Sequence, residues 1–114
     1  MAYGTRVSYE AIREVAAAGV GAAYGAVGTA TTDHTRILRI VSSLDAEVYV
    51  SFDGTTDHIR MAGNSFVLYD YSTNKIHDDG LFLSQGTTIY VKRVSGAPTT
   101  GSLWIEVVYA TGGV

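Results

Sequence analysis

The chain lacks cysteine altogether, holds one proline in 114 residues, and is charged at only 17% of its positions. The absence of cysteine excludes disulfides, thiolate metal sites and a cysteine nucleophile. Eight Lys and Arg against eleven Asp and Glu give a formal net charge of −3. Because no excess of positive charge is available to contact phosphates, we expect no direct nucleic-acid partner.

Long hydrophobic runs are also missing. The longest stretch without charge, 15–32, is built mainly from Ala, Gly, Val and Thr. Its glycines interrupt any continuous apolar surface, whereas a membrane span needs roughly 20 predominantly apolar residues. Residues 1–14 carry mixed charge instead of the basic start and apolar core of a secretory signal. We therefore expect neither a membrane segment nor an export signal.

The remaining composition favours one β domain. From Arg36 onward, β-branched and aromatic runs alternate with Gly, Asp, Asn, Ser and Thr at roughly 8–12-residue intervals, which is typical of a sandwich or barrel. We predict an all-β fold: a single antiparallel β-sandwich over 1–114, jelly-roll or immunoglobulin-like, with about eight short strands. Its termini are expected to be flexible, with 1–11 as a possible arm and 110–114 as a tail.

The expected strands after the first third lie at 36–42, 47–52, 58–61, 65–71, 81–83, 88–94 and 102–109. The clearest is 47–52, where apolar and polar side chains alternate and Asp53-Gly54 then predicts a tight turn. The first third is less regular. Residues 8–18 fit either a thin amphipathic helix or a strand at about 12–17 that precedes another at about 22–27, and we favour the strands.

Three regular strands place an aliphatic set on one side and amphipathic residues on the other. The outward residues are Glu47, Tyr49, Tyr90, Lys92, Trp104 and Glu106. Because large aromatics with polar tips are enriched in protein interfaces, we expect these six to belong to a sheet face that a partner covers. The alternative is that the rings pair across a solvated sheet or line the second half of the core. The low charged fraction favours the interface.

Catalytic and metal-binding patterns are weak. Two similar segments contain Asp33-His34 and Asp57-His58, and His77 is followed by two aspartates. These residue types can bind a divalent ion, but no His-x-His or His-x-x-x-His spacing occurs, and Asp or Thr at a loop end more often bonds nearby backbone. No Gly-x-Ser-x-Gly, Walker or His-Glu-x-x-His motif occurs either. We therefore predict no enzyme, no metal and no cofactor.

The strand sequences as a set resemble small structural proteins of tailed bacteriophages. The resemblance covers roughly residues 3–109 and is carried by RILRIV (36–41), AEVYVSFDGTTDH (46–58), GNSFVLYD (63–70), GTTIYVK (86–92) and GSLWIEV (101–107). It implies a β-sandwich subunit present in many copies at the neck, collar or tail, or on the capsid surface. It also implies contacts with copies of itself and with portal, tail or major capsid proteins.

That family relationship further implies a protein made in the bacterial host cytoplasm and incorporated into the virion. The N-terminal pattern of the family begins with strands, which agrees with the strand prediction for the first third. The alternative function is a carbohydrate-binding sandwich, in which Tyr49, Tyr90 and Trp104 would stack on sugar rings.

Overall fold

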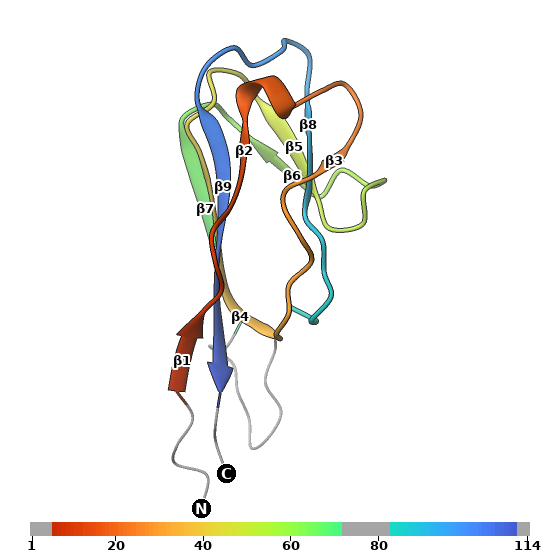
Figure 1. Ribbon diagram of the computed structural model, residues 1–114. Coiled ribbons are helices and arrows are strands. Elements are labelled where there is room, and N and C mark those ends of the chain that lie inside the picture. Colours follow the sequence, from red (N-terminus) through yellow and green to blue (C-terminus); the bar gives the residue numbers. More distant parts are fainter. Residues whose placement is uncertain (1–5, 72–82, 112–114) are drawn as a thin grey trace, which may run out of the picture.

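The computed structural model describes residues 6–71 and 83–111, and these form two antiparallel sheets packed face to face (Figure 1). The strands are β1 (Arg6–Tyr9), β2 (Arg13–Ala16), β3 (Gly25–Ala26), β4 (Thr35–Ser42), β5 (Val48–Ser51), β6 (Ile59–Met61), β7 (Ser65–Asp70), β8 (Tyr90–Arg93) and β9 (Ser102–Thr111). A short 3-10 turn, η1 (Ala17–Gly19), follows β2. The predicted all-β sandwich is confirmed.

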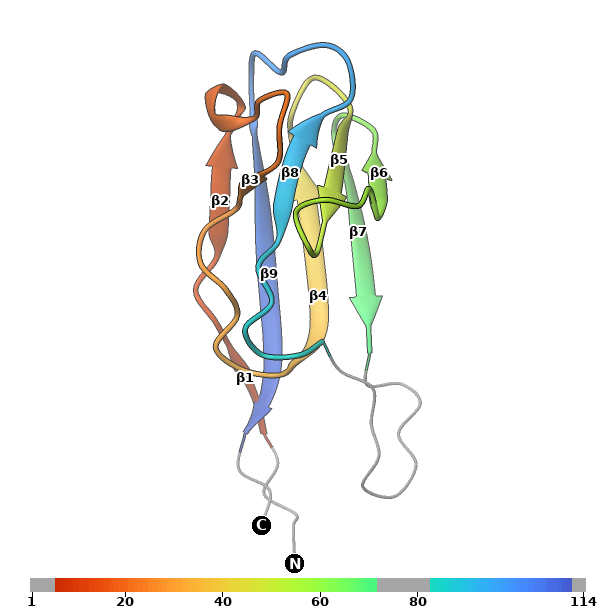
Figure 2. The same ribbon diagram turned by 90° about the vertical axis from the view of Figure 1, so that its right-hand side faces the viewer.

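The two sheets have a nested connectivity. In sheet A the order is β1-β9-β4-β7, with β2 also paired to β9, and in sheet B the order is β3-β8-β5-β6. Each early strand therefore pairs with a late one: β2 with β9, β3 with β8, β4 with β7, and β5 with β6. Because successive nested pairs alternate between the sheets, the chain is a rolled-up double ribbon, the jelly-roll member of the two predicted types. Figure 2 shows sheet B lying in front of sheet A.

The core lies between the sheets and is almost wholly aliphatic. Its fully buried side chains include Leu38, Ile40, Val48, Val50, Ile89, Val91, Leu103, Ile105 and Val107. Strand alternation explains this set, because every second residue of a strand faces the opposite sheet. The inward residues predicted on 47–52, 88–94 and 102–109 are buried as expected, apart from Phe52, which is half-buried.

The first third contains strands, as favoured, but one of them lies where an arm was expected. Tyr9 pairs with Val108 and Val7 with Ala110, so β1 extends the edge of sheet A beside the last residues of β9. Residues 6–9 and 110–111 are therefore part of the sheet, whereas residues 1–5 and 112–114 lie outside the described range. β9 is ten residues long, and β1 and β2 run in the same direction and pair with successive halves of one of its edges.

The strand predicted at about 22–27 is observed only as β3, Gly25–Ala26. From residue 36 onward the strand predictions match within two residues at each end, with one exception. Of the expected strand 81–83, only Leu83 is described, and it forms an isolated bridge with Thr35. The predicted turn after β5 is present, and Gly54 has a positive φ of 81°. No helix in the described part of the chain has the length and hydrophobicity of a transmembrane span.

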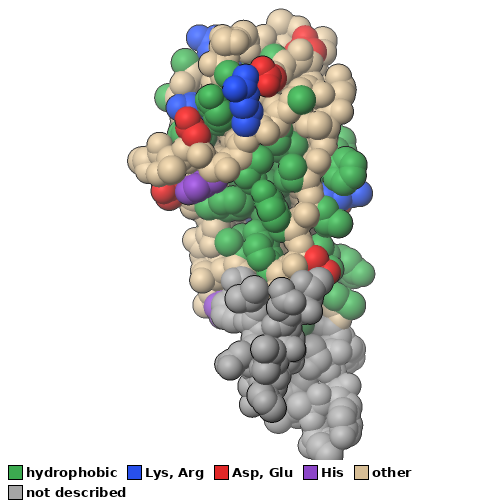
Figure 3. All heavy atoms as spheres, turned by 180° about the vertical axis from the view of Figure 1, so that it is seen from behind, with side chains coloured by type: hydrophobic (Ala, Val, Ile, Leu, Met, Phe, Trp, Pro, Cys, Tyr) green, Lys and Arg blue, Asp and Glu red, His purple; other side chains and the backbone are tan. Residues whose placement is uncertain are grey.

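One side of the sandwich is open between the sheets. β7 and β6 are the edge strands there, and Figure 3, which faces this side, shows hydrophobic side chains running as a band between the sheets. Half-buried Ile59 and Val67 pack against the core at this edge, as does Tyr71, whose ring stacks on that of Tyr69 at 5.9 Å. Side chains at this edge are thus only partly covered by the described chain.

Candidate functional site

The outer face of sheet A carries the largest set of exposed hydrophobic side chains. On β9 the buried residues are Leu103, Ile105 and Val107, so the residues between them point away from the core. The ladder register extends this alternation across the sheet: Trp104 lies opposite Val41, and Val41 lies opposite Phe66. Three neighbouring strands therefore present apolar residues on the same outer side.

We call this surface the apolar face. It comprises Val7, Tyr9, Ile12, Ile37, Val41, Phe66, Leu68, Trp104 and Val108. Five of them, Val7, Tyr9, Ile12, Phe66 and Leu68, are between 56% and 72% exposed. With about 150–250 Å² for a whole aromatic side chain and less for an aliphatic one, these five alone expose on the order of 500 Å² of apolar area. Phe66 and Leu68 lie on one edge strand and the other three at the opposite edge, with half-buried Ile37, Val41, Trp104 and Val108 between them. The summed area is within the range of about 300–600 Å² for the largest patch on a typical monomer.

An ion pair lies near the centre of the apolar face. The Arg39 guanidinium donates to both carboxylate oxygens of Glu106, with Nε–Oε1 at 2.6 Å and Nη2–Oε2 at 3.0 Å. These hydrogen bonds, with a smaller contribution from the Trp104 indole, lower the pKa of Glu106. Because the two charges neutralise each other across β4 and β9, a partner meets a mainly apolar surface with an internally paired cluster near its centre. Glu14 on β2 and Asp70 on β7 lie on the same side of the sheet, on its edge strands.

The outer face of sheet B is polar, and its aromatic side chains already have partners within the chain. The Lys92 ammonium lies 4.7 Å from the Tyr24 ring centroid and 5.7 Å from that of Tyr49, and 3.4 Å from an Asp57 carboxylate oxygen. The Tyr24 hydroxyl donates to the same carboxylate. Burial, followed by this hydrogen bond, raises the pKa of Tyr24. This face is therefore a connected intramolecular network.

The six predicted interface residues divide between these two faces. Glu47, Tyr49, Tyr90 and Lys92 belong to sheet B, whereas Trp104 and Glu106 belong to sheet A. Glu47 forms an ion pair with Arg60 at 3.0 Å, and the Tyr90 ring packs over Gly54. The expectation of a single face containing all six is wrong. Alternation along a strand shows which residues share a side, but the sheet to which a strand belongs depends on distant pairing.

The histidines that suggested a metal site serve the turns instead. His34 Nδ1 accepts the backbone N–H of Gln85 at 3.0 Å, and His58 Nδ1 accepts that of Phe52 at 3.0 Å. Asp53 accepts the N–H groups of Thr55 and Thr56, and these bonds lower its pKa. The part of the chain that the structure describes holds no cluster of three metal-ligating side chains. His77 and the two aspartates after it lie outside that part.

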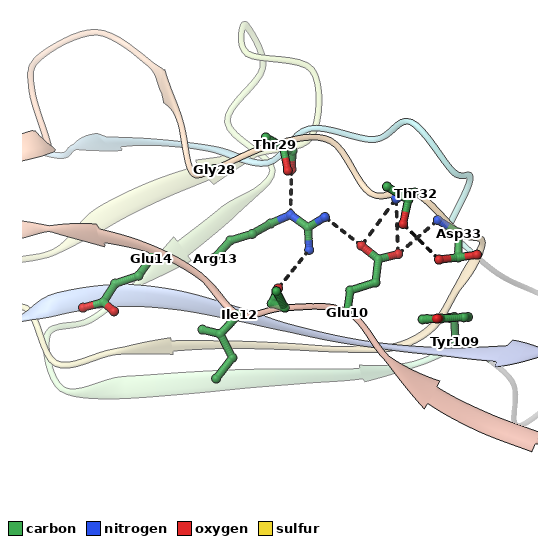
Figure 4. A pocket seen from close by; sticks show the side chains of 10 residues that line it. Glu10, Ile12, Arg13, Glu14, Gly28, Thr29, Thr32, Asp33 and Tyr109 are labelled. Atoms are coloured by element: carbon green, nitrogen blue, oxygen red, sulfur yellow. Dashed lines mark hydrogen bonds and ion pairs between the residues drawn. The ribbon is translucent and has the colours of Figure 1, made fainter.

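A pocket of about 510 Å³ lies between the β1–β2 edge and the loop that precedes β4 (Figure 4). Its floor is the Arg13–Glu10 ion pair, with Nη2–Oε1 at 2.7 Å and side chains that are 9% and 6% exposed. Arg13 also donates to the carbonyls of Thr29 and Ala30, at 2.6 and 3.0 Å. Ile12 points to the opposite side of the segment, toward the apolar face.

The Glu10 and Arg13 side chains in this pocket are held by several hydrogen bonds. Burial acts to raise the pKa of Glu10, but hydrogen bonds from Arg13 and from the N–H groups of Thr32 and Asp33, at 3.2 and 3.0 Å, outweigh it and lower the pKa. The pair therefore fastens the 28–33 loop to the edge of sheet A. We interpret it as a structural clasp. No local pattern predicts this clasp, because the fold alone brings the 28–33 loop against Glu10 and Arg13.

Comparison with protein-family models, with curated proteins and with solved structures finds no match to this chain. The apolar face is therefore the structural feature on which the proposed function rests.

Proposed function

We propose that this chain is a structural subunit of a tailed-phage virion, present in many copies and assembled through protein–protein contacts at the neck, collar or tail or on the capsid surface. Its partners are copies of itself and other virion proteins, such as portal, tail or major capsid proteins. It is made in the bacterial host cytoplasm and functions in the particle. The proposal rests on the sequence resemblance and on one structural observation, the apolar face.

The apolar face supports assembly because its size fits an interface. Five side chains expose on the order of 500 Å², and half-buried Ile37, Val41, Trp104 and Val108 add to this. A standard protein–protein interface buries about 800 Å² on each partner. Burial of apolar area contributes roughly 25 cal/mol per Å² to the free energy of association. Covering the apolar face would therefore favour binding of a partner. Sheet B, with its polar outer network, offers no comparable surface.

The fold by itself does not choose between the two functions expected from the sequence, because jelly rolls occur in both viral capsid proteins and lectins. The positions of the aromatic residues do favour one. A sugar platform needs Tyr49, Tyr90 and Trp104 side by side, but Trp104 lies on the sheet opposite to the two tyrosines. Tyr49 and Tyr90 are also engaged with Lys92 and Gly54. We therefore propose assembly and not carbohydrate binding.

We also propose that the protein is not an enzyme. The support is that His34 and His58 each use Nδ1 to accept a backbone N–H, and that the charged pair in the pocket of about 510 Å³ is bonded to the 28–33 loop.

Mass spectrometry of purified, disrupted phage particles tests the virion assignment. The chain is expected among the particle proteins in many copies per particle. Two phage variants then test the face: Ile12→Lys, on the apolar face, and Ala97→Lys, on an exposed loop away from it. We expect Ile12→Lys to reduce incorporation while the loop variant is incorporated normally. Absence of the wild-type chain from particles would refute the virion assignment, and equal incorporation of both variants would refute the role of the face.

A further inference from the structure

β7 is an open edge of sheet A with exposed hydrophobic side chains. Among the described strands it pairs only with β4. Phe66 is 63% exposed, Leu68 56% and Tyr69 37%. Natural sheet proteins usually protect such an edge with charge, proline or a bulge, because its free N–H and C=O groups invite another strand. The SFVLY sequence of residues 65–69 has none of these protections.

The hydrogen-bonding direction of each β7 residue follows from the ladder. Tyr71 donates its N–H to the Arg36 carbonyl at 2.7 Å, in continuation of the β4–β7 register. Since antiparallel ladders alternate, the backbones of residues 65, 67 and 69 turn toward β4, and those of Phe66, Leu68 and Asp70 turn toward the open edge. Phe66 and Leu68 therefore direct two N–H groups and two carbonyls toward this edge at regular spacing.

We propose that β7 pairs antiparallel with β7 of a second copy, centred on Val67, so that sheet A continues across a two-fold axis. This inference rests on the proposed function and names the partner of this edge as the chain itself. Phe66 then lies opposite Leu68 of the second copy, and the two residues exchange two N–H···O bonds. The two-fold axis repeats this pair, which gives four such bonds around the central Val67 pair.

The alternation of side chains along β7 limits the registers in which two copies of the strand can pair. Residues directly opposite each other in a ladder point to the same side, so a two-fold pairing must be centred on a residue and not between two. A centre at Leu68 would set the Asp70 carboxylate against the Phe66 ring of the second copy. A centre at Val67 places Asp70 opposite Asn64 and sets Phe66 against Leu68, which keeps the apolar face continuous between the copies.

A second copy of the chain is the partner whose side chains match those on both sides of β7. Phe66 and Leu68 extend the apolar face, while Val67 and Tyr69 border the band between the sheets. An identical strand supplies matching side chains to both. The exposed parts of Phe66, Leu68 and Tyr69 amount to on the order of 300 Å² per copy, which is below a standard interface. The pairing is therefore weak in free solution and is reinforced where many copies are held together on a particle.

The natural absence of cysteine makes a direct test possible. In the proposed register the two Val67 Cα atoms form a non-hydrogen-bonded pair about 4.5 Å apart, within disulfide reach. The Leu68 Cα atoms of the two copies would lie diagonally, roughly 8 Å apart and too far for a bridge. Oxidised glutathione would accept the two electrons and two protons released as two thiols form one disulfide. Non-reducing electrophoresis and mass spectrometry then detect the covalent dimer.

We expect Val67→Cys to give a covalent dimer and Leu68→Cys to remain monomeric. An equal mixture of Phe66→Cys and Leu68→Cys should give the mixed dimer. Because both positions are exposed, this pair of variants still tests the register if Val67→Cys fails to fold. Adding Phe66→Lys to Val67→Cys should reduce the dimer at least tenfold, whereas adding Ile12→Lys, at the far edge of the apolar face, should leave it unchanged.

The outcomes separate this inference from the proposed function. Bridging of Leu68→Cys, or of neither Val67→Cys nor the mixed pair, would overturn the register or the pairing. Such a result would leave the virion assignment standing if the wild-type chain is found in particles. A chain that forms the Val67 bridge but is absent from particles would support the pairing and refute the virion assignment.

Discussion

Gly101 is the position at which one methyl group should do the most damage to the fold. It precedes β9 with a φ of 88°, in the left-handed region that L-residues avoid. A Cβ there would lie 2.5 Å from the carbonyl carbon of Ser43 and closer still to its oxygen. Both atoms belong to backbone, so the clash cannot be relieved by turning a side chain. Gly101→Ala must therefore displace the segment where β4 ends.

The expected loss of folding stability in Gly101→Ala has two contributions. A positive φ costs an alanine about 1–2 kcal/mol. Displacing Ser43 also weakens its bonds to Ser102: the Ser43 N–H to the Ser102 carbonyl at 2.8 Å and the Ser102 N–H to Ser43 Oγ at 3.0 Å. At about 1 kcal/mol for each bond, the total loss is about 4 kcal/mol. With an m-value of about 1.5 kcal/mol per M of urea, the unfolding midpoint falls by roughly 2.5 M.

Two other glycines separate these contributions. Gly86 has a φ of 83° but open space around a built Cβ, and Gly96 has open space without a positive φ. Urea unfolding followed by Trp104 fluorescence should rank the three alanine variants: Gly96→Ala within about 0.5 kcal/mol of wild type, Gly86→Ala lower by about 1–2 kcal/mol, and Gly101→Ala lowest. If Gly101→Ala loses no more stability than Gly86→Ala, the close approach of β4 and β9 at this point is wrong.

Three further predictions concern charged groups. Arg13→Ala should lower the free energy of unfolding by about 3 kcal/mol, because it leaves the Glu10 carboxylate buried without its partner; a loss below 1 kcal/mol in urea unfolding would contradict the clasp. Hydrogen bonds from the Thr99 hydroxyl and N–H lower the pKa of Asp45 from 3.8 to about 2. The resulting stabilisation is present above pH 3.8 and is lost as pH falls toward 2, so Asp45→Asn should flatten the stability–pH curve in that window only. A double-mutant cycle on Arg39 and Glu106, which are partly exposed, should give a weak coupling that falls with added salt; a strong, salt-independent coupling would count against an exposed pair.

Much of the fold could be predicted from local sequence pattern. The alternation in 47–52 predicts β5 with Val48 and Val50 inside, and Asp53-Gly54 predicts the turn that follows, because both signals depend only on neighbouring residues. β1 was missed because its stability comes from the far half of β9, about a hundred residues later in the chain. Short segments of this kind become strands through their partners and not through their own pattern.

The candidate site was predicted less well for a related reason. Trp104 was placed correctly on the outer side of its strand, but its neighbours Val41 and Phe66 come from strands that only the three-dimensional register brings together. Phe66 and Leu68 alternate with Val67 and Tyr69, so a sequence of apolar residues on both sides of β7 resembles a buried strand. Their exposure is visible only once β7 is known to be an edge.

The nested connectivity also determines the order in which the protein can be completed during synthesis. β5 and β6 pair across a short loop and can form early, whereas β9 pairs with β1, β2 and β4 and is synthesised after all of them. Contacts between such distant segments form slowly. Sheet A therefore lacks a central strand in every nascent chain that has not reached β9. Because Trp104 and Val108 lie on that strand, the apolar face is complete only after β9 has been synthesised and has paired.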